Sequence, residues 1–226
     1  MEFFCVVLVL VLGTCAAAPQ DLRGKMFTFP EESGTNFVKM DVDLKELSAF
    51  TVCMRVFTDL LRPHTLLQLT TNSSSGIFLS NAPRPSQYYV QYNQTTVYFN
   101  SNYYKVNTWQ SLCCSWMAHN GIVRLWVNGE PSSRKFLSQT PMKAPLAVVI
   151  GEVRVLLLSW VLFPSFSPSP FSGMVSDLHM WDYELRPSQI QLFGPMTNFG
   201  EGNVLSWQNL DFQTHGRVLL ESKYAT

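Results

Sequence analysis

Apolar positions between residues 50 and 127 fall into short runs rich in aromatic and β-branched residues, and polar residues separate the runs. This pattern is typical of β-strands joined by turns. Asn120-Gly121 and Asn128-Gly129 stand where two of the runs end, and Asn-Gly supplies the positive φ that tight hairpin turns require. We therefore predict antiparallel strands over residues 50–57, 66–71, 76–80, 88–93, 96–100, 109–117 and 122–127.

The segment "RPSQIQLF", which begins at Arg186, has the features of a helix. Pro187 suits the first turn, and Ser188 with Gln191 three residues later has the spacing of a capping box. We predict one short α-helix near residues 187–193. Many strands with a single helix indicate an all-β, two-sheet antiparallel sandwich.

The N-terminus has an apolar run, Phe3 to Leu12, followed by small residues up to Ala18. This order is typical of a secretory signal peptide, which we predict over residues 1–18. A buried strand or an anchor helix is the alternative, but the run is shorter than the about 20 apolar residues that cross a membrane. We expect a secreted, extracellular protein with no membrane span. Since no long linker divides the rest, residues 19–226 are predicted to form a single domain.

Three cysteines, Cys53, Cys113 and Cys114, remain after the predicted cleavage. A secreted chain is expected to oxidise one pair and to leave one thiol over. Adjacent residues of a strand point to opposite faces, so only one of Cys113 and Cys114 can face Cys53. The N-x-[ST] sequons at Asn72 and Asn93 are candidate glycosylation sites in the same compartment.

Charge and motifs exclude several classes of function. Lys plus Arg and Asp plus Glu both count 16, so no excess charge favours nucleic acid. The sequence has no G-x-S-x-G elbow and no Gly-rich phosphate loop, and we predict that the protein is not an enzyme. The histidines lack the spacing of a zinc site and are expected on the surface or in loops; they are His64, His119, His179 and His215.

One carboxylate cluster, in "DVDLKE", supports a remote alternative. Asp41 and Asp43 would share one face of a strand, and two carboxylates about 5 Å apart serve as nucleophile and acid in glycosidases. Glu46 would fall on the opposite face. We keep a sandwich-fold glycosidase as an alternative to a solvated strand end before a turn.

The segment "SLCCSWMA", residues 111–118, resembles the pentraxin signature H-x-C-x-[ST]-W-x-[ST]. It keeps Cys113, Ser115 and Trp116, whereas Ser111 and Ala118 replace the first and last residues of the signature. Other segments resemble the same family in the same order, and the resemblance covers nearly all of residues 20–212. These segments are "KMFTFPEES", "AFTVCMRVFTDL", "GIVRLWVNGEP", "HMWDYELRPSQI" and "NVLSWQNLDF".

The resemblance implies a secreted jelly-roll sandwich of the concanavalin and laminin-G kind, assembled as a homo-oligomer, usually a ring of five. It also implies a pattern-recognition function in innate immunity, with calcium-dependent binding of phosphocholine or carbohydrate-type ligands. A disulfide between Cys53 and Cys113 follows from the resemblance, and Cys114 is then the free thiol. This thiol is either open to mispairing and an inter-subunit link or buried as a small apolar residue.

The first pair of calcium ligands of the family falls on Ser74 and Ser75, in the loop before "GIFLS". Calcium takes six to eight oxygens, mostly from carboxylates and carbonyls, so two serines are weak substitutes. Asn72 is a further candidate if it carries no glycan. Ser80 stands where the family has a bulky apolar side chain at its phosphocholine site, so this contact is not matched.

The second set of calcium ligands falls on Val153, Arg154 and Val155. Valine offers no side-chain oxygen, and an arginine repels a divalent cation. These residues open an anomalous, insertion-like segment over residues 152–172, with an apolar run followed by Pro, Ser and Phe. We consider two explanations. Either the protein has diverged into a calcium-independent or inactive relative, or the segment is translated non-coding sequence from a splicing or annotation anomaly.

Overall fold

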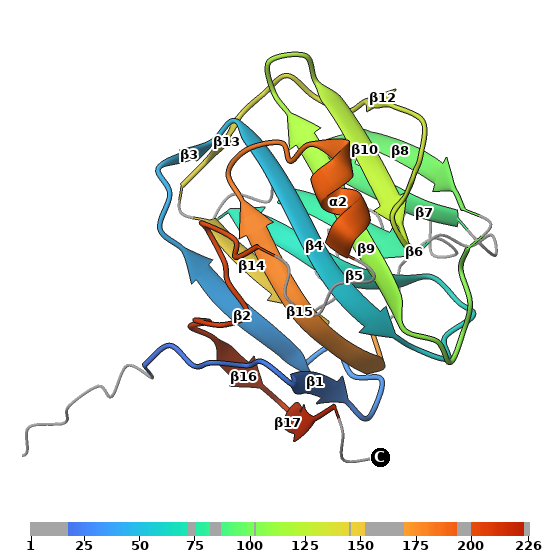
Figure 1. The fold of residues 1–226 in the computed structure, drawn as a ribbon, viewed down its shortest axis with the longest axis vertical. Helices are drawn as coiled ribbons and strands as arrows, with labels where there is room; N and C mark the ends of the chain where they lie inside the picture. Colours follow the sequence, from blue (N-terminus) through green and yellow to red (C-terminus); the bar gives the residue numbers. More distant parts are fainter. Residues whose placement is uncertain are drawn as a thin grey trace, which may run out of the picture.

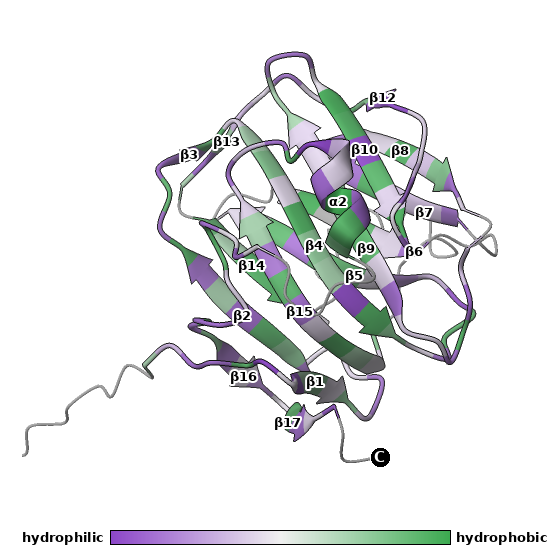
Figure 2. Cartoon of the chain, viewed as in Figure 1, coloured by the Kyte–Doolittle hydropathy of each residue, from purple (hydrophilic) through white to green (hydrophobic). Residues whose placement is uncertain are grey.

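A computed structural model describes residues 18–71, 76–81, 87–101, 103–144, 146–151, 170–193 and 200–223 of the chain. Two antiparallel sheets face each other in this part of the chain, and one short helix lies on the outside of one of them (Figure 1). Most of the hydrophobic colour lies on the strands of the two sheets (Figure 2). The predicted all-β, two-sheet antiparallel sandwich is confirmed.

The eight-stranded sheet is centred on the two strands that carry the disulfide. Seven of its strands run in the order β11-β10-β9-β4-β15-β1-β17, and β12 also pairs with β10. Every pairing is antiparallel. The bounds are β1 Lys25–Phe29, β4 Ala49–Phe57, β9 Gln110–Met117, β10 Ile122–Val127, β11 Glu130–Pro131, β12 Lys135–Phe136, β15 Gly173–Trp181 and β17 Leu219–Ser222.

The seven-stranded sheet has the order β16-β2-β14-β5-β6-β7-β8, so β8 lies at one edge. Among the described strands, β3 (Glu46–Leu47) and β13 (Met142–Lys143) form a separate two-stranded sheet. The bounds in the larger sheet are β2 Phe37–Val42, β5 His64–Thr71, β6 Gly76–Asn81, β7 Gln87–Tyr92, β8 Thr95–Asn100, β14 Leu146–Ile150 and β16 Gln213–His215.

The predicted strands match β4 to β10 to within two residues at each end. The turn at Asn128-Gly129 has positive φ at both residues, 53° and 81°, as a type I′ hairpin turn requires. At the other Asn-Gly pair only Gly121 has a positive φ, of 71°. Asn-Gly therefore marked both turns, but only one of them has the expected geometry.

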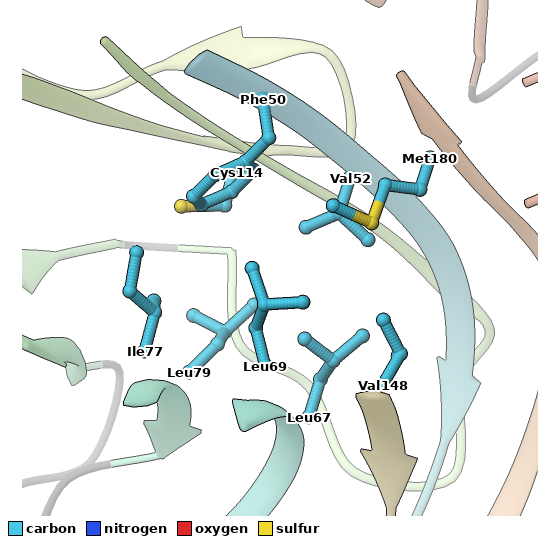
Figure 3. Close-up of a pocket in the computed structure, with 9 residues that line it drawn as sticks. All are labelled: Phe50, Val52, Leu67, Leu69, Ile77, Leu79, Cys114, Val148 and Met180. Atoms are coloured by element: carbon cyan, nitrogen blue, oxygen red, sulfur yellow. The ribbon is translucent and has the colours of Figure 1, made fainter. Parts of the chain in front are cut away.

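Alternating side chains of the two sheets meet in the core between them. Leu67 and Leu69 of β5 point toward Phe50 of β4 and Cys114 of β9 (Figure 3). A space of about 10 Å³ remains between them, and the side chains around it are all apolar. A cavity of this size and lining stays dry, because a water molecule needs polar partners. This part of the core therefore has no room for a ligand.

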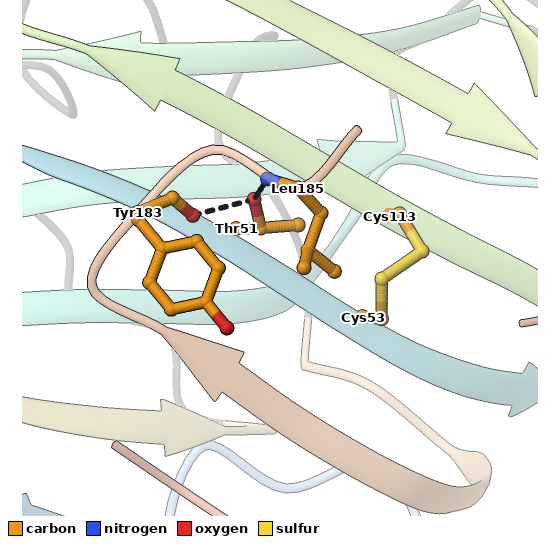
Figure 4. Close-up of a disulfide and its surroundings, with 5 residues drawn as sticks. All are labelled: Thr51, Cys53, Cys113, Tyr183 and Leu185. Carbon is orange, nitrogen blue, oxygen red and sulfur yellow. Dashed lines mark hydrogen bonds between the residues drawn. A yellow bond between two sulfur atoms is a disulfide. The ribbon is translucent and has the colours of Figure 1, made fainter. Parts of the chain in front are cut away.

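Cys53 and Cys113 stand opposite each other on β4 and β9 and form the disulfide implied by the family resemblance, with 4.1 Å between their Cα atoms (Figure 4). The next residue, Cys114, points to the other face of the sheet and is a buried free thiol. Burial raises the pKa of this thiol to about 12, so it stays protonated and unreactive. Of the two expectations for Cys114, the structure supports the packed apolar residue.

The helix α2 (Pro187–Phe193) packs over the disulfide on the outer face of the eight-stranded sheet. Trp126 and Trp181, together with Leu185, Ile190 and Phe193, complete this second apolar cluster. Thr51 anchors the approach to the helix, since its hydroxyl donates to the Tyr183 carbonyl and accepts from the Leu185 amide, both at 2.9 Å (Figure 4).

The predicted helix is confirmed, but its predicted cap is wrong. Ser188 is the second residue of the helix, whereas a capping residue precedes the first. Arg186 holds the position before the helix, and the side-chain oxygen of Gln189, the third helical residue, accepts from the backbone N–H of Arg186 at 3.0 Å. The helix therefore begins two residues earlier than the Ser188 and Gln191 pair indicated.

Candidate functional site

One residue at a family-type ligand position, Ser80, lies on the outer face of the seven-stranded sheet. Leu67, Leu69 and Leu79 point into the core, so their neighbours along the strands point outward. Ser80 is one of these outward residues, and its hydroxyl lies 3.3 Å from that of Thr65 on β5. Ser80 is fully buried, so it offers no exposed apolar contact for a ligand.

The strand ends on this sheet show where the calcium-type positions would begin. β6 begins at Gly76 beside Thr70, and β14 ends at Ile150 beside Leu67, so both ends flank β5. The candidate residues themselves lie outside the described residues; they are Asn72, Ser74, Ser75, Val153, Arg154 and Val155. The structure therefore places the ends of both segments on one sheet and does not test the individual ligands.

The chemistry of this donor set does not fit calcium. At the positions that the resemblance assigns to calcium, the chain has serines, valines and an arginine, whereas the ion prefers carboxylates and amides. Within the described ranges, no group of three or more His, Cys, Asp or Glu side chains is placed to hold a metal ion. These residues therefore do not supply the oxygen ligands through which calcium would hold a phosphocholine or carbohydrate group.

The carboxylates considered for a glycosidase do not form a pair on one strand. Asp41 lies on β2, where Lys39 holds it in an ion pair at 2.8 Å. β2 ends at Val42, so Asp43 lies beyond the strand, and Glu46 belongs to β3 in a different sheet. The prediction that one strand presents Asp41 and Asp43 on a shared face is wrong, because that strand ends too early.

Two adjacent strands, β7 and β8, present uncharged polar and aromatic side chains on the outer face. Tyr88, Val90 and Phe99 point into the core, so their neighbours point outward. The outward side chains form three cross-strand pairs, which we call the β7–β8 platform. They are Gln87 with Asn100, Tyr89 with Tyr98, and Gln91 with Thr96.

The two tyrosines occupy the middle of the β7–β8 platform. Their ring centroids are 5.9 Å apart and the rings are inclined by 48°. Tyr98 is 44% exposed, whereas burial raises the pKa of Tyr89, against a smaller opposing effect of its hydrogen bond with Ser80. At one end, the Gln87 amide donates to the side-chain oxygen of Asn100 at 2.8 Å. The platform was not predicted from the sequence, although the alternation of polar and apolar residues in "QYYVQY" indicates a strand with one outward polar and aromatic face.

Asn93 lies in the turn between β7 and β8, next to one end of the β7–β8 platform. It is exposed and has a positive φ of 53°. Its side chain is therefore accessible to a glycosyltransferase, and glycosylation at Asn93 stays a prediction. The other sequon, at Asn72, lies outside the described residues.

Two of the four histidines are buried, so the expectation that all lie on the surface or in loops is wrong for them. His64 begins β5, and burial lowers its pKa to about 4. Its Nδ1 lies 2.8 Å from the Arg62 carbonyl, and its Nε2 is buried without a partner. His179 on β15 is also buried, which lowers its pKa to about 4. His119 and His215 are exposed, as expected.

The end of the anomalous segment packs into the domain. Phe171 is fully buried against Phe29 and His64, with ring centroids 5.4 and 5.7 Å away. On either side, Arg62 donates to the Pro170 carbonyl at 3.1 Å and Thr58 donates to the Ser172 carbonyl at 2.8 Å. Residues 170–172 are therefore part of the sandwich. Residues 152–169 lie outside the described residues, and their origin stays a hypothesis.

Comparison with known proteins identifies the relatives of this chain. Residues 25–222 match the model of the Pentaxin family. The chain is 32% identical to a C-reactive protein of Xenopus laevis, over 99% of this chain and 92% of that protein. It is 33% identical to the serum amyloid P-component of Mus musculus, over 90% of this chain and 89% of that protein.

A solved structure supports the fold. The native heptameric SAP-like pentraxin from Limulus polyphemus superposes with a TM-score of 0.74 and 18% identity, over 90% of this chain and 97% of that one. This similarity confirms the jelly-roll sandwich that the resemblance implied. In the part of the chain that the structure describes, no helix has the length and apolar character needed to cross a membrane.

Proposed function

Because the chain belongs to the pentraxin family, we propose that it is a secreted pattern-recognition protein of innate immunity. Its ligands are molecules that carry phosphocholine or carbohydrate groups. The family model covers residues 25–222, and the relatives at about 30% identity cover most of the chain, which supports a shared recognition function. The protein acts by binding and is not an enzyme.

The observation that carries this proposal is the match to the family model over residues 25–222, and the seven-stranded sheet offers an exposed surface for a ligand. The beginning of β6 at Gly76 and the end of β14 at Ile150 both lie beside β5. The β7–β8 platform continues the same face toward the edge of the sheet. The opposite outer surface, on the eight-stranded sheet, is covered by α2 around the disulfide. The exposed part of the seven-stranded sheet, at the β7–β8 platform, is therefore the surface that we propose binds the ligand.

Secretion is supported by the disulfide between Cys53 and Cys113, because such bonds form and persist in oxidising compartments. We propose that residues 1–18 are the signal peptide and that the mature domain is extracellular. Sequencing the N-terminus of the protein secreted by cultured animal cells tests this point. A protein that stays in the cell with its first residues intact would contradict it.

We further propose that the protein assembles into a ring of identical subunits. The Limulus relative is described as heptameric, and the family resemblance indicates five subunits for this chain. Light scattering coupled to size-exclusion chromatography gives the mass directly. A mass of one subunit at physiological concentration would contradict the ring.

The central test is retention on immobilised ligands. We expect the secreted protein to bind phosphocholine-coupled resin or a carbohydrate array and to be released by the free ligand. Each binding assay is run with calcium and with a chelator, because calcium is the cofactor expected of the family. Absence of retention on every phosphocholine and carbohydrate surface in both conditions would contradict the proposed function.

A further inference from the structure

We propose that the β7–β8 platform binds an uncharged sugar ring and that this binding does not require calcium. The inference rests on the proposed function, since it names the ligand class and the surface for the same recognition face. The inference differs from the calcium-dependent binding of the family in two ways. The ligand lies at the edge of the sheet, and the side chains of this chain supply all its contacts.

The chemistry of the β7–β8 platform matches a neutral sugar. A pyranose ring presents apolar C–H groups on its faces and hydroxyls around its edge. The exposed ring of Tyr98 offers an aromatic surface for such a face. Four amide and hydroxyl side chains surround the tyrosines and can both donate and accept hydrogen bonds; they are Gln87, Gln91, Thr96 and Asn100.

The charge of the β7–β8 platform argues against phosphocholine at this place. None of its six side chains is an Asp, Glu, Lys, Arg or His. A phosphate is normally bound by arginine or lysine, and a quaternary ammonium is bound by a cage of aromatic rings. Two tyrosines inclined by 48° make an open surface instead of a cage. A neutral ligand is the partner that this surface fits.

The β7–β8 platform is also held in place before a ligand arrives. The six cross-strand pairs of β7 and β8 run from Gln87 with Asn100 to Tyr92 with Thr95. On the core side, Tyr88, Val90 and Phe99 are at most 1% exposed. A surface fixed by the strands and the core loses little conformational entropy on binding, so weak individual contacts add up. Since β8 lies at the edge of the sheet, a ligand can approach Tyr98 from solvent.

Independence from calcium follows from the donor set. The positions that the family resemblance assigns to calcium carry two serines, two valines and an arginine in this chain, which do not fit the ion. A recognition protein that retains the face without the metal ligands must bind through its own side chains. The β7–β8 platform provides such side chains.

The test uses the full-length secreted protein and an array of neutral oligosaccharides built from glucose, galactose and mannose. Three variants are compared with the wild type, all at exposed positions. Tyr98→Ala removes the aromatic surface, and Tyr183→Ala is the matched control because Tyr183 is 47% exposed in the loop between β15 and α2, away from the platform. Asn93→Gln removes the predicted glycan next to the platform. A glycan at this position could occupy the platform of its own chain and block the added oligosaccharide.

We expect binding to at least one neutral oligosaccharide, unchanged by a chelator, about tenfold weaker in Tyr98→Ala and unchanged in Tyr183→Ala. Thermal unfolding of each variant shows whether the fold is retained. Loss of all binding in the chelator would overturn this inference and leave the proposed function standing. Equal binding by Tyr98→Ala and the wild type would also overturn it. Absence of carbohydrate and phosphocholine binding in every condition would overturn both proposals.

Discussion

The two sheets of the sandwich use their outer faces in opposite ways. On the eight-stranded sheet, α2 and the loop after β15 cover an apolar surface that includes Trp126, Trp181 and the disulfide. On the seven-stranded sheet, the β7–β8 platform is polar and aromatic, and Tyr98 remains exposed. The covered face stabilises the fold, whereas the exposed β7–β8 platform at the edge of the other sheet is available for a ligand. Substitutions on the two faces should therefore have separable effects on stability and on binding.

Removal of the disulfide has the largest effect that we expect. The double variant Cys53→Ala, Cys113→Ala opens a loop with a sequence separation of 60 residues. The free energy of unfolding should fall by about 4 kcal/mol, because the cross-link restricts the unfolded chain. Urea denaturation measures the change. Cys114→Ala, which removes only a buried sulfur, is the control, and a loss there as large as in the double variant would contradict the assignment of the bond.

Acid should weaken the fold through the buried His64. Its pKa is about 4 in the folded protein and 6.5 in an ordinary setting, so the unfolded chain binds the proton first as the pH falls. The stabilisation is complete above pH 6.5, declines as the pH falls from 6.5 to about 4 and is lost below that. It amounts to about 3 kcal/mol. Urea denaturation of His64→Phe across this range should show a smaller decline than the wild type, and equal slopes would contradict it. Burial also lowers the pKa of His179, so this residue adds a similar decline in stability to the wild type and to His64→Phe.

Loss of the Thr51 hydroxyl tests how firmly the covered face is held. Thr51→Val keeps the shape and removes both hydrogen bonds, to the Tyr183 carbonyl and from the Leu185 amide. We expect the free energy of unfolding to fall by about 2 kcal/mol, because the buried Leu185 amide loses its partner. Hydrogen exchange should become faster at the amide of Leu185. Unchanged exchange there would show that the loop is held by packing alone.

The smallest effect on stability is expected on the open face. Tyr98→Ala should lower the free energy of unfolding by about 1 kcal/mol, because the ring is 44% exposed and the substitution removes its contact with Tyr89. The same variant should weaken binding to a neutral oligosaccharide about tenfold. Thermal unfolding and glycan binding measured on one preparation separate the two effects. A large loss of stability with unchanged binding would place Tyr98 among the structural residues.

Much of the fold could be predicted because strands and turns depend on local residue types. The strands β4 to β10 match their predicted bounds to within two residues, since aromatic and β-branched runs favour strands in any context. The disulfide followed from the family resemblance, and the sequence alone left Cys113 and Cys114 as alternatives. The burial of Cys114 depends on which face of β9 meets the other sheet, which local pattern does not determine.

The features that were missed depend on contacts between distant segments. His64 is buried because Phe171, more than 100 positions later, packs against it. The cap of α2 uses Gln189 because the chain enters the helix at Arg186, a position set by the loop that Thr51 anchors. The β7–β8 platform became a candidate site only when the sheet order showed β8 at an edge. The residue types of the platform can be seen in the sequence, but their exposure depends on the order of the strands in the sheet.

A crystal structure of the secreted protein, grown in a chelator with the neutral oligosaccharide that binds best on the array, tests the central claim most directly. We predict a sugar ring stacked on Tyr98, with hydrogen bonds to the amide and hydroxyl side chains of the β7–β8 platform. A ligand bound only after calcium is added, and seated beside the ends of β6 and β14, would contradict the account.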